Sequence, residues 1–373
     1  MARPIPIVYC HFVPWKLPPS RQQYLMESVS RHHPVYFLDM VPHRLGRLEF
    51  PRIERLSPNL ALIQHPFNLR FRRHANRFPV LSSLIDSGFL RRILQRDGVG
   101  EYVYWLAASD FVLYRGMDHR RLVFDCIDPC FTGDYERFDF EEETIARRAR
   151  VVFCTAAVLL EKMQRFNANC HLLPNAAPAE IYHPSVLQRL SPPDVRRPVV
   201  GYMGTLDWRF DADMVMAVAR QMPEVTFVLT GRSVPDQVER IAPLRQCPNV
   251  VFTGPVDVEQ GRAWVAAFDV GLIPFLTGPM GDAINPVKMY MYLAAGKPVV
   301  ATWIRECRGY EPHVTATQTP ADMVAAIRRA LQPPLSTRGD ERVCIGQQNT
   351  WDARADQALA VLQQVGLLSP PRR

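Results

Sequence analysis

Short apolar runs and longer amphipathic stretches alternate along most of this chain. A short apolar run bounded by turn residues is typical of a buried strand, whereas apolar positions three or four residues apart are typical of a helix that covers a sheet. Their alternation predicts parallel sheets with helices on their faces. In the first half we expect strands at 5–10, 34–39, 60–64, 110–114, 121–125, 150–154 and 170–173, with helices near 20–32, 137–149 and 156–166.

The alternation is interrupted at residues 174–198, which hold six prolines and little periodicity. Such a stretch is typical of a linker between domains. After it the same pattern resumes, which predicts a second doubly wound domain. Ligands bind at the carboxyl ends of such strands, so we expect a binding cleft between the two halves. In the second half we expect strands at 199–204, 225–230, 250–253, 269–274 and 298–302, with helices near 211–221, 258–267, 286–295 and 351–366.

Composition and length agree with two globular domains. The chain has 373 residues, of which 47% are hydrophobic, and this length is too great for one ordinary core. No stretch reaches the roughly 18 apolar residues of a membrane-spanning helix. The first residues lead directly into a strand and lack the pattern of a signal peptide, and the eight cysteines are scattered. We therefore expect a cytoplasmic protein with reduced thiols.

Positive charge is concentrated in one segment, residues 41–100, which holds eleven arginines against four acidic residues. This local excess equals the net charge of the whole chain, +7. Aromatic residues are interleaved with the arginines, most densely at Arg70, Phe71, Arg72, Arg73 and Arg77. The pattern suits an anionic membrane surface or a lipid phosphate, and a solvated basic face without a partner is the alternative. No nucleic-acid motif accompanies it, so we expect no nucleic-acid partner.

The most distinct candidate site is the predicted helix at 286–295. Asn285 is a good N-cap, Pro286 suits the first helical position, and Gly296 favours a left-handed stop. The amino end of a helix carries partial positive charge and free N–H groups, so it can bind an anion. Lys288 lies in the first turn, where its ammonium group could meet a phosphate. The alternative is a buried amphipathic helix with a surface lysine.

This helix, within residues 282–302, resembles the nucleotide-sugar site of the GT-B glycosyltransferases of exopolysaccharide and teichuronic acid assembly. Residues 201–208 resemble the glycine turn of these enzymes, 173–184 their interdomain segment, and 14–23 their opening motif. The resemblance implies an α/β fold of the GT-B class, with two doubly wound Rossmann-like domains facing each other across a cleft. It places an acceptor-binding domain at 1–185 and a nucleotide-sugar-binding domain at 186–350. The helix 351–366 would pack back onto the first domain.

The resemblance also implies roles for single residues. Lys288 would contact the donor diphosphate, and Gly204 and Thr205 would offer it backbone N–H groups. A cationic partner is expected near the glycine turn, with Arg209 as the first candidate and Arg232 as the second, because arginine can bind a diphosphate bidentately. Each arginine could instead be an ordinary surface charge.

One departure from the family pattern concerns the two glutamates of its E-x7-E motif, which stand at Ala283 and Met291 in this chain. Met291 lies three residues after Lys288 and so shares its helix face, but methionine cannot hold a ribose hydroxyl as a carboxylate does. It could pack against a sugar or a base. Asp282 could stand in for the first glutamate. The departure leaves open whether the reaction retains or inverts the sugar's configuration.

A second signal is the apolar run 122–126, which Asp128 follows closely. The segment resembles one in xanthan-type glucuronosyltransferases, where the aspartate at the position of Asp128 serves as general base toward the acceptor hydroxyl. A turn-capping role for Asp128 is the alternative.

The resulting hypothesis is a metal-independent glycosyltransferase without a cofactor. Its donor would be a UDP- or GDP-linked sugar. Its acceptor would be a saccharide, free or carried on a polyprenyl diphosphate at the inner face of the plasma membrane, in surface polysaccharide assembly. A catalytically degenerate nucleotide-sugar-binding scaffold and a sugar-nucleotide epimerase on the same fold are the alternatives.

Overall fold

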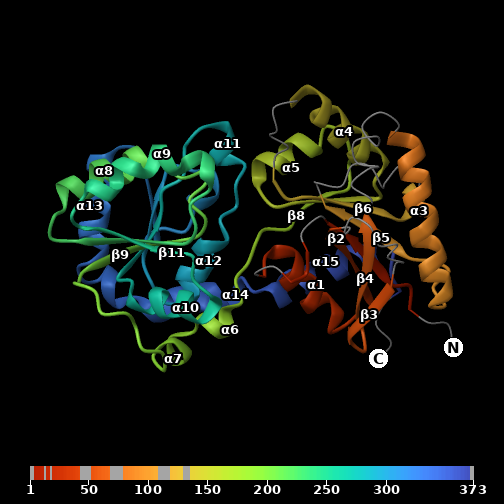
Figure 1. Cartoon of the computed structure of the whole chain (residues 1–373), viewed down its shortest axis with the longest axis horizontal. Helices are drawn as coiled ribbons and strands as arrows, with labels where there is room; N and C mark the ends of the chain where they lie inside the picture. The colour runs from red at the N-terminus through yellow and green to blue at the C-terminus, as the bar shows by residue number, and fades with distance from the viewer. Residues whose placement is uncertain are drawn as a thin grey trace. The chain divides into compact units, whose positions relative to one another are not determined.

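The computed structural model of the chain describes residues 4–11, 14–16, 19–42, 52–67, 79–107, 118–128 and 135–369. It divides into two compact units (Figure 1). Unit 1 comprises Met1–Pro174 and Asp352–Arg373, and unit 2 comprises Asn175–Trp351. The division falls at Pro174, whereas the sequence placed the boundary at 185. Residues 175–185 belong to unit 2 because Asn175 is hydrogen-bonded within it and the short helix α6 (Ala179–Tyr182) packs there against α12 (Val287–Ala294).

In its described part, unit 1 has an eight-stranded sheet in the order β3-β4-β2-β1-β5-β6-β7-β8. All neighbouring pairs are parallel except β3 with β4, an antiparallel edge that the sequence did not predict. The strands are β1 (Ile7–Cys10), β2 (Val35–Pro42), β3 (Arg52–Ser57), β4 (Leu60–Phe67), β5 (Val103–Ala107), β6 (Leu122–Cys126), β7 (Val151–Cys154) and β8 (Cys170–Leu172). The helices are α1 (Arg21–Ser30), α3 (Pro79–Arg96), α4 (Tyr135–Arg148), α5 (Ala157–Met163) and α15 (Trp351–Gln364).

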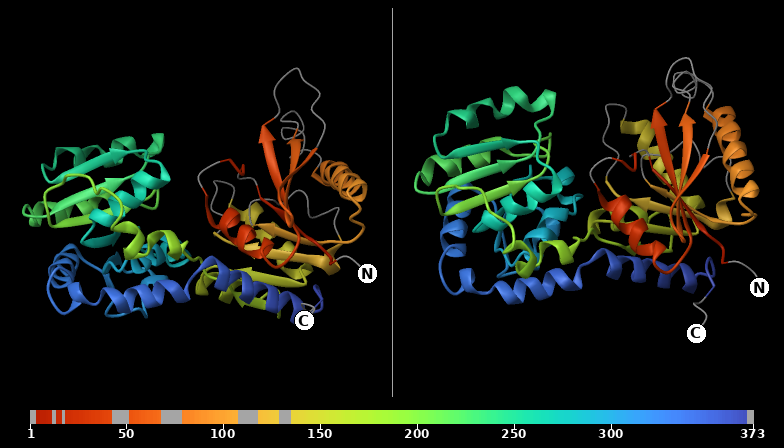
Figure 2. Two further views of the ribbon diagram at one scale, coloured as in Figure 1. Left: turned by 90° about the horizontal axis from the view of Figure 1, so that it is seen from below. Right: turned by 60° about the horizontal axis from the view of Figure 1, so that its bottom comes forward.

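Helix α15 lies almost wholly in unit 1, although residues 175–350, which belong to unit 2, precede it along the chain. It lies beside α1 in both views of Figure 2, where Arg31 forms an exposed ion pair with Asp352. Gln357 donates a hydrogen bond of 2.8 Å to the carbonyl of Leu172. The chain therefore closes unit 1 with its last helix.

Unit 2 has a fully parallel six-stranded sheet in the order β11-β10-β9-β12-β13-β14. The chain proceeds outward from β9 to β11 and then returns to β9's other side with β12, so the strand order reverses beside β9. Ligands bind at the carboxyl ends of the strands at such a switch point. The strands are β9 (Val199–Met203), β10 (Thr226–Thr230), β11 (Val250–Gly254), β12 (Val270–Ile273), β13 (Val299–Thr302) and β14 (Val314–Thr317).

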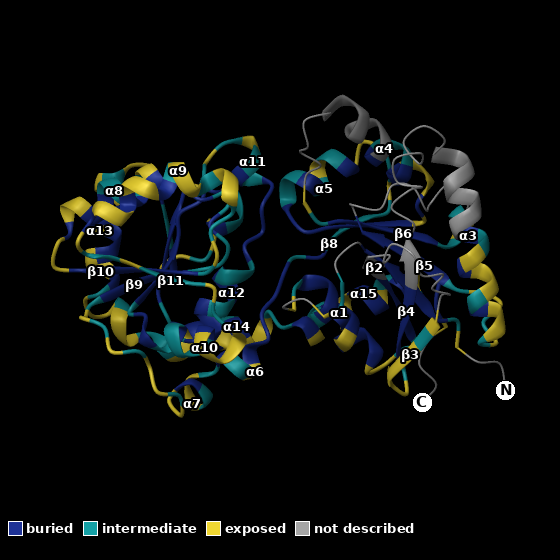
Figure 3. Cartoon of the chain, viewed as in Figure 1, coloured by how far each residue is buried: buried dark blue, intermediate teal, exposed yellow. Residues whose placement is uncertain are grey.

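Helices cover both faces of the unit 2 sheet, and the buried strands lie between their exposed outer surfaces (Figure 3). Helix α14 packs against α12 so closely that a Cβ atom on Gly346 would lie 2.5 Å from the Cα atom of Ala294. The described helices besides α6 and α12 are α7 (Pro184–Leu187), α8 (Ala212–Gln221), α9 (Val238–Ile241), α10 (Val258–Ala267), α11 (Pro279–Asp282), α13 (Pro320–Ala330) and α14 (Gly339–Gln348).

The arginine-rich segment is described only in part. Arg70, Phe71, Arg72, Arg73 and Arg77 lie outside the described residues, as does the strand predicted at 110–114. In the described part, Arg91, Arg92 and Arg96 are exposed on α3, and Arg55 on β3 pairs with Asp97 at 2.6 Å. Among the helices that the structure describes, none has the length and apolar character needed to cross a bilayer.

Candidate donor site in unit 2

Two glycines join the carboxyl ends of β9 and β10. Gly204 follows β9 with φ +149° and donates a hydrogen bond of 2.9 Å to the carbonyl of Thr230. Gly231 follows β10 with φ +133°, and a Cβ atom there would lie 2.2 Å from the carbonyl oxygen of Gly204. Both backbone conformations favour glycine, and the contact leaves no room for a side chain at Gly231. The turn is thus held at the switch point of the sheet.

Lys288 lies directly beside this turn. A Cβ atom on Gly204 would be 3.3 Å from Lys288 Nζ, and the ammonium group lies 5.0 Å from the ring centre of Tyr202 and 4.4 Å from that of Phe275. The pKa of Lys288 is lowered to about 7, chiefly by burial and next by the charge of Arg209, while the charge of Asp207 opposes both. A buried cation without a matching anion is costly, so the surroundings of Lys288 favour the arrival of a negatively charged ligand.

The helix that carries Lys288 begins one residue later than the sequence suggested. Its N-cap is Pro286, and Asn285 does not cap it. The side-chain oxygen of Asn285 instead accepts a hydrogen bond of 2.9 Å from the backbone N–H of Asn175. The other end agrees with the prediction, because Gly296 has φ +70° and ends the helix.

Arg209 belongs to the same group of residues. Its guanidinium binds both oxygens of Asp207, with Nε 3.0 and 3.1 Å from them, and lies 5.9 Å from the ring centre of Phe275. The Asp207 carboxyl has a pKa below its usual value: burial would raise it, but the hydrogen bond and charge of Arg209 lower it. Arg209 is therefore oriented by Asp207 close to Lys288, and Thr205 fixes the turn between them by accepting a hydrogen bond of 2.8 Å from Tyr202.

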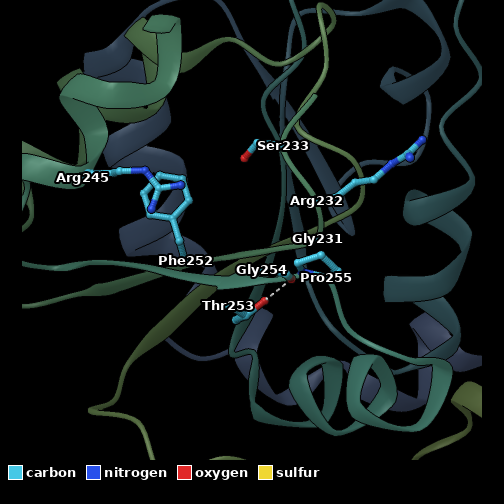
Figure 4. Close-up of a pocket in the computed structure, with 8 residues that line it drawn as sticks. All are labelled: Gly231, Arg232, Ser233, Arg245, Phe252, Thr253, Gly254 and Pro255. Carbon is cyan, nitrogen blue, oxygen red and sulfur yellow. Dashed lines mark hydrogen bonds between the residues drawn. The ribbon is translucent and has the colours of Figure 1, made fainter. Parts of the chain in front are cut away.

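A pocket of about 440 Å³ opens beside the glycine turn, at the carboxyl ends of β10 and β11 (Figure 4). Arg245 covers one side of it with its guanidinium 4.3 Å from the ring centre of Phe252. The carbonyl of Arg232 accepts a hydrogen bond of 2.9 Å from Leu206, while its exposed side chain points away from Arg245. The lining residues are Gly231, Arg232, Ser233, Arg245, Phe252, Thr253, Gly254 and Pro255.

Ala283 and Met291, which stand at the positions of the motif glutamates, and the neighbouring Asp282 are engaged in other contacts. Oδ1 of Asp282 accepts hydrogen bonds from the backbone N–H of Arg305 at 2.7 Å and from Nη2 of Arg308 at 3.1 Å. Met291 is half-buried and packs against the hydrophobic core of unit 2. Ala283 is buried, with 2% of its surface exposed.

The candidate general base lies in unit 1. Asp128 is exposed two residues beyond the end of β6, and Thr155 donates a hydrogen bond to the carbonyl of Ile127, the preceding residue. Asp125, within β6, is fully buried and forms an ion pair of 3.0 Å with Arg21. Asp128 thus follows a strand end that is fixed from two sides.

Several residues of the site were missed from the sequence. Tyr202 and Phe275 are core residues whose rings also lie under Lys288, and core and site roles give the same apolar pattern. Asp207 could have been found, because an aspartate two residues before an arginine in a turn is a recognisable local pair. Within the described residues, no cluster of three or more His, Cys, Asp or Glu side chains could hold a metal ion.

Comparison with known proteins identifies the class. Residues 197–333 match the family of glycosyl transferases group 1. The chain superposes on sucrose-phosphate synthase from Thermosynechococcus elongatus with a TM-score of 0.72 and 17% identity, covering 97% of this chain and 99% of that one. It superposes on HepE from Anabaena, in complex with UDP and glucose, with a TM-score of 0.66 and 14% identity, covering 96% and 99%. The chain therefore has the GT-B fold of glycosyltransferases, as predicted, and carries a glycosyl transferases group 1 domain in unit 2.

A curated relative is more similar in sequence over a shorter stretch. TuaH of Bacillus subtilis (strain 168), named for a glycosyltransferase role in teichuronic acid biosynthesis, is 31% identical over 147 residues. The match covers 38% of this chain and 36% of TuaH, so it spans about a third of that protein's length.

Proposed function

We propose that this protein is a glycosyltransferase that uses a nucleoside-diphosphate sugar as its donor. The observation that carries the proposal is the position of Lys288, a desolvated cation beside the Gly204 turn, at the switch point of a glycosyl transferases group 1 domain. The solved structures of similar fold include a trehalose-6-phosphate enzyme from E. coli bound with UDP-2-fluoro glucose (TM-score 0.71, 11% identity) and HepE with UDP and glucose.

In the proposed reaction the bond between the sugar and the diphosphate breaks, and negative charge develops on the leaving phosphate oxygen. Lys288 and Arg209 stabilise this charge, together with the free N–H groups at the start of α12. Gly204 and Thr205 let the backbone approach the phosphates closely. These cations supply the stabilisation without a bound metal.

The nucleobase would occupy the pocket beside the glycine turn. Gly231, which lines it, contacts Gly204 directly, so a diphosphate at the turn leaves its nucleoside next to this pocket. Arg245 stacked on Phe252 offers N–H donors to base carbonyl oxygens.

A thermal-shift series with UDP, GDP, dTDP and ADP tests the donor proposal. A ligand that binds only the folded protein raises the unfolding midpoint, by an amount that corresponds to about 2.7 kcal/mol at a concentration 100 times its Kd. We expect UDP or GDP to give the largest shift. Equal and negligible shifts with all four nucleotides, confirmed by calorimetry, would contradict the proposal.

The acceptor half of the proposal rests on unit 1. The acceptor would be a saccharide carried on a polyprenyl diphosphate at the inner face of the plasma membrane, and the product a bacterial surface polysaccharide. The exposed arginines of α3 and the name of TuaH support this assignment. Asp128 would take the proton of the acceptor hydroxyl as that oxygen attacks the anomeric carbon.

Replacing Asp128 with asparagine is expected to lower turnover about 100- to 10,000-fold, because a positioned general base contributes rate enhancements of that order. Donor affinity should stay unchanged, since Asp128 belongs to unit 1 and the donor site to unit 2. The two readouts are the rate of sugar transfer by the protein to acceptors in membrane extracts and its calorimetric affinity for the nucleotide. Normal turnover by the variant would remove Asp128 from the role of base.

A nucleotide-sugar-binding scaffold without turnover is the second candidate. It is favoured by Met291 and Ala283, which stand at the positions of the two motif glutamates and are engaged in core packing. Nucleotide binding without transfer to any membrane extract would support it.

A further inference from the structure

A buried tyrosine of α12 reaches the carboxyl end of β9. The hydroxyl oxygen of Tyr292 accepts a hydrogen bond of 2.8 Å from the backbone N–H of Met203, which is 89 residues away along the chain. Tyr292 is fully buried, and burial raises the pKa of its hydroxyl, so the group stays neutral. Met203 is the last residue of β9, and Gly204 follows it directly. The hydrogen bond therefore fixes the end of the strand immediately before the glycine turn.

The acceptor for Met203 is a side chain because β9 and β12 separate at this point. Successive residues of a strand direct their backbone N–H groups to alternate sides. The N–H of Gly204 goes to the carbonyl of Thr230 on β10, so that of Met203 is directed toward β12. The ladder between β9 and β12 includes only Val200 and Gly201 of β9, so it ends before Met203. The hydroxyl from α12 thus supplies the acceptor that the sheet lacks at its switch point.

Two glycines in register make room for this contact. Gly201 of β9 and Gly271 of β12 are paired across the two strands. A Cβ atom on Gly271 would lie 2.3 Å from Cδ2 of Tyr292, and one on Gly201 would lie 2.2 Å from Cδ1 of Phe268. The two rings pack edge to face with their centres 6.2 Å apart. The missing side chains of the glycine pair thus let the Tyr292 ring lie against the sheet with its hydroxyl at the end of β9.

Tyr292 and Lys288 lie on one face of α12. Tyr292 comes one turn after Lys288, and side chains at i and i+4 are neighbours on a helix. The ammonium nitrogen of Lys288 lies 3.3 Å from the position of a Cβ atom on Gly204, and Tyr292 binds the N–H of the residue before this glycine. One helix face therefore places its cation beside the glycine turn and holds the strand that leads into the turn.

We propose that Tyr292 is a positioning residue that sets the distance between Lys288 and the glycine turn. The inference rests on the proposed function and adds to it the contact that keeps the diphosphate site assembled before the donor arrives. Groups that are already held at the right separation bind a ligand without first losing conformational freedom. Because Tyr292 is fully buried, it acts through the backbone of β9 and not on the donor itself.

Tyr292→Phe tests this contact, because it removes the hydroxyl and keeps the ring. The N–H of Met203 loses its acceptor, and the end of β9 is released. We expect the Kd of UDP to rise about three- to tenfold, because binding must restore an arrangement that one hydrogen bond maintained. Sugar transfer should slow about 100-fold, since a small displacement of a group that holds the reacting phosphates is costly. Calorimetry and a transfer assay give the two measurements, with GDP in place of UDP if GDP gives the larger thermal shift.

The pH dependence of UDP affinity separates positioning from a general loss of stability. In the wild type the pKa of Lys288 is lowered to about 7, chiefly by burial. A released turn lets water reach the ammonium group, which raises this pKa toward its ordinary value of 10.5. The affinity of Tyr292→Phe for UDP should therefore begin to fall at a higher pH than that of the wild type. A loss of stability alone would leave this pH unchanged.

Thr317→Val is the matched control, because it also removes one buried hydroxyl from the sheet region of unit 2. Thr317 donates a hydrogen bond of 2.9 Å from Oγ1 to the carbonyl of Ala301 and has 4% of its surface exposed. It belongs to the edge strand β14, and β12 and β13 lie between β14 and β9. Thr317→Val should lower the unfolding midpoint but leave the Kd of UDP and its pH dependence at the wild-type values. A loss of affinity equal to that of Tyr292→Phe would overturn the inference.

Hydrogen exchange resolved to single amides gives a readout that needs no variant. In the wild type the N–H of Met203 should exchange as slowly as the ladder amides of β9. Exchange of this amide at the rate of surface amides would overturn the inference. An unchanged Kd and pH dependence in Tyr292→Phe would also overturn it, and both results leave the proposed function standing. A wild-type protein that binds neither UDP nor GDP would overturn both.

Discussion

Replacing Lys288 with methionine is expected to lower the rate of transfer severely and to weaken nucleoside-diphosphate binding strongly. Methionine keeps most of the volume that packs over Tyr202 and Phe275, but it removes the charge that would meet the diphosphate. Losing one preorganised donor to a developing charge lowers kcat by about 100- to 1,000-fold. Calorimetry with the best nucleotide from the thermal-shift series, together with a transfer assay, gives the measurement.

The same substitution should stabilise the ligand-free protein at neutral pH. The unfolded chain binds the lysine proton below the ordinary pKa of 10.5, whereas the folded protein binds it only below about 7. Between these values the unfolded state holds more protons, so the stability contributed at Lys288 falls as the pH decreases from 10.5 and is lowest at and below pH 7. Methionine has no such cost. A thermal unfolding midpoint that is lower for the ligand-free Lys288→Met protein than for the ligand-free wild type at pH 7 would contradict this account.

Nucleotide affinity of the wild type should depend on pH for the same reason. Above pH 7 the free protein has a neutral Lys288, so binding a diphosphate must take up a proton, and affinity should fall by up to about tenfold per pH unit. Between pH 7 and 9 a terminal phosphate is already ionised, since its second pKa is about 6, and does not contribute. Lys288→Met should show a flat profile.

Lys297 offers a matched control. Burial lowers its pKa to about 8, and it donates a hydrogen bond of 3.0 Å to the carbonyl of Ala266. It lies beyond the other end of α12, just before β13 begins. Lys297→Met should leave nucleotide affinity and its pH dependence unchanged. Equal losses in both variants would show that the effect comes from disturbed packing and not from a lost phosphate contact.

The sequence was sufficient to predict the parts of the fold that follow from local patterns. The alternation of apolar runs gave most strands of both sheets, and helix α10 has the bounds that were expected, 258–267. Gly204 and Lys288 were assigned to one site through the resemblance to the GT-B glycosyltransferases, whereas the local pattern by itself marked only the helix start with its lysine as an anion site. Their contact in the structure brings together two segments that were each recognised separately.

The sequence failed where a role depends on a partner far along the chain. Asn285 has the residue type of an N-cap, but its oxygen is taken by Asn175, which is 110 residues away. Strand β5 was missed although its five buried residues form an apolar run like those of the strands that were predicted. The antiparallel β3 is largely exposed and carries charges, so its sequence lacks the apolar run of an inner strand.

Replacing Arg21 with methionine is expected to destabilise unit 1 by about 3–5 kcal/mol, because it leaves a buried carboxylate without its partner. Asp125 is fully buried and Arg21 has 3% of its side chain exposed, with 3.0 Å between Nη2 and Oδ1. Arg21 also donates a hydrogen bond of 3.2 Å to the carbonyl of Pro174, the last residue before the chain enters unit 2. The free energy of unfolding of the variant and of the wild type, measured by chemical denaturation and by calorimetry, checks this prediction.

Combining Arg21→Met with Asp125→Asn should recover part of the lost stability, since the amide carries no charge. Arg120→Met is the control: its pair with Asp118 is exposed and should contribute little. Nucleotide binding should persist in Arg21→Met because the donor site belongs to unit 2. An Arg21→Met protein as stable as Arg120→Met would show that this ion pair does not hold the strand end that precedes Asp128.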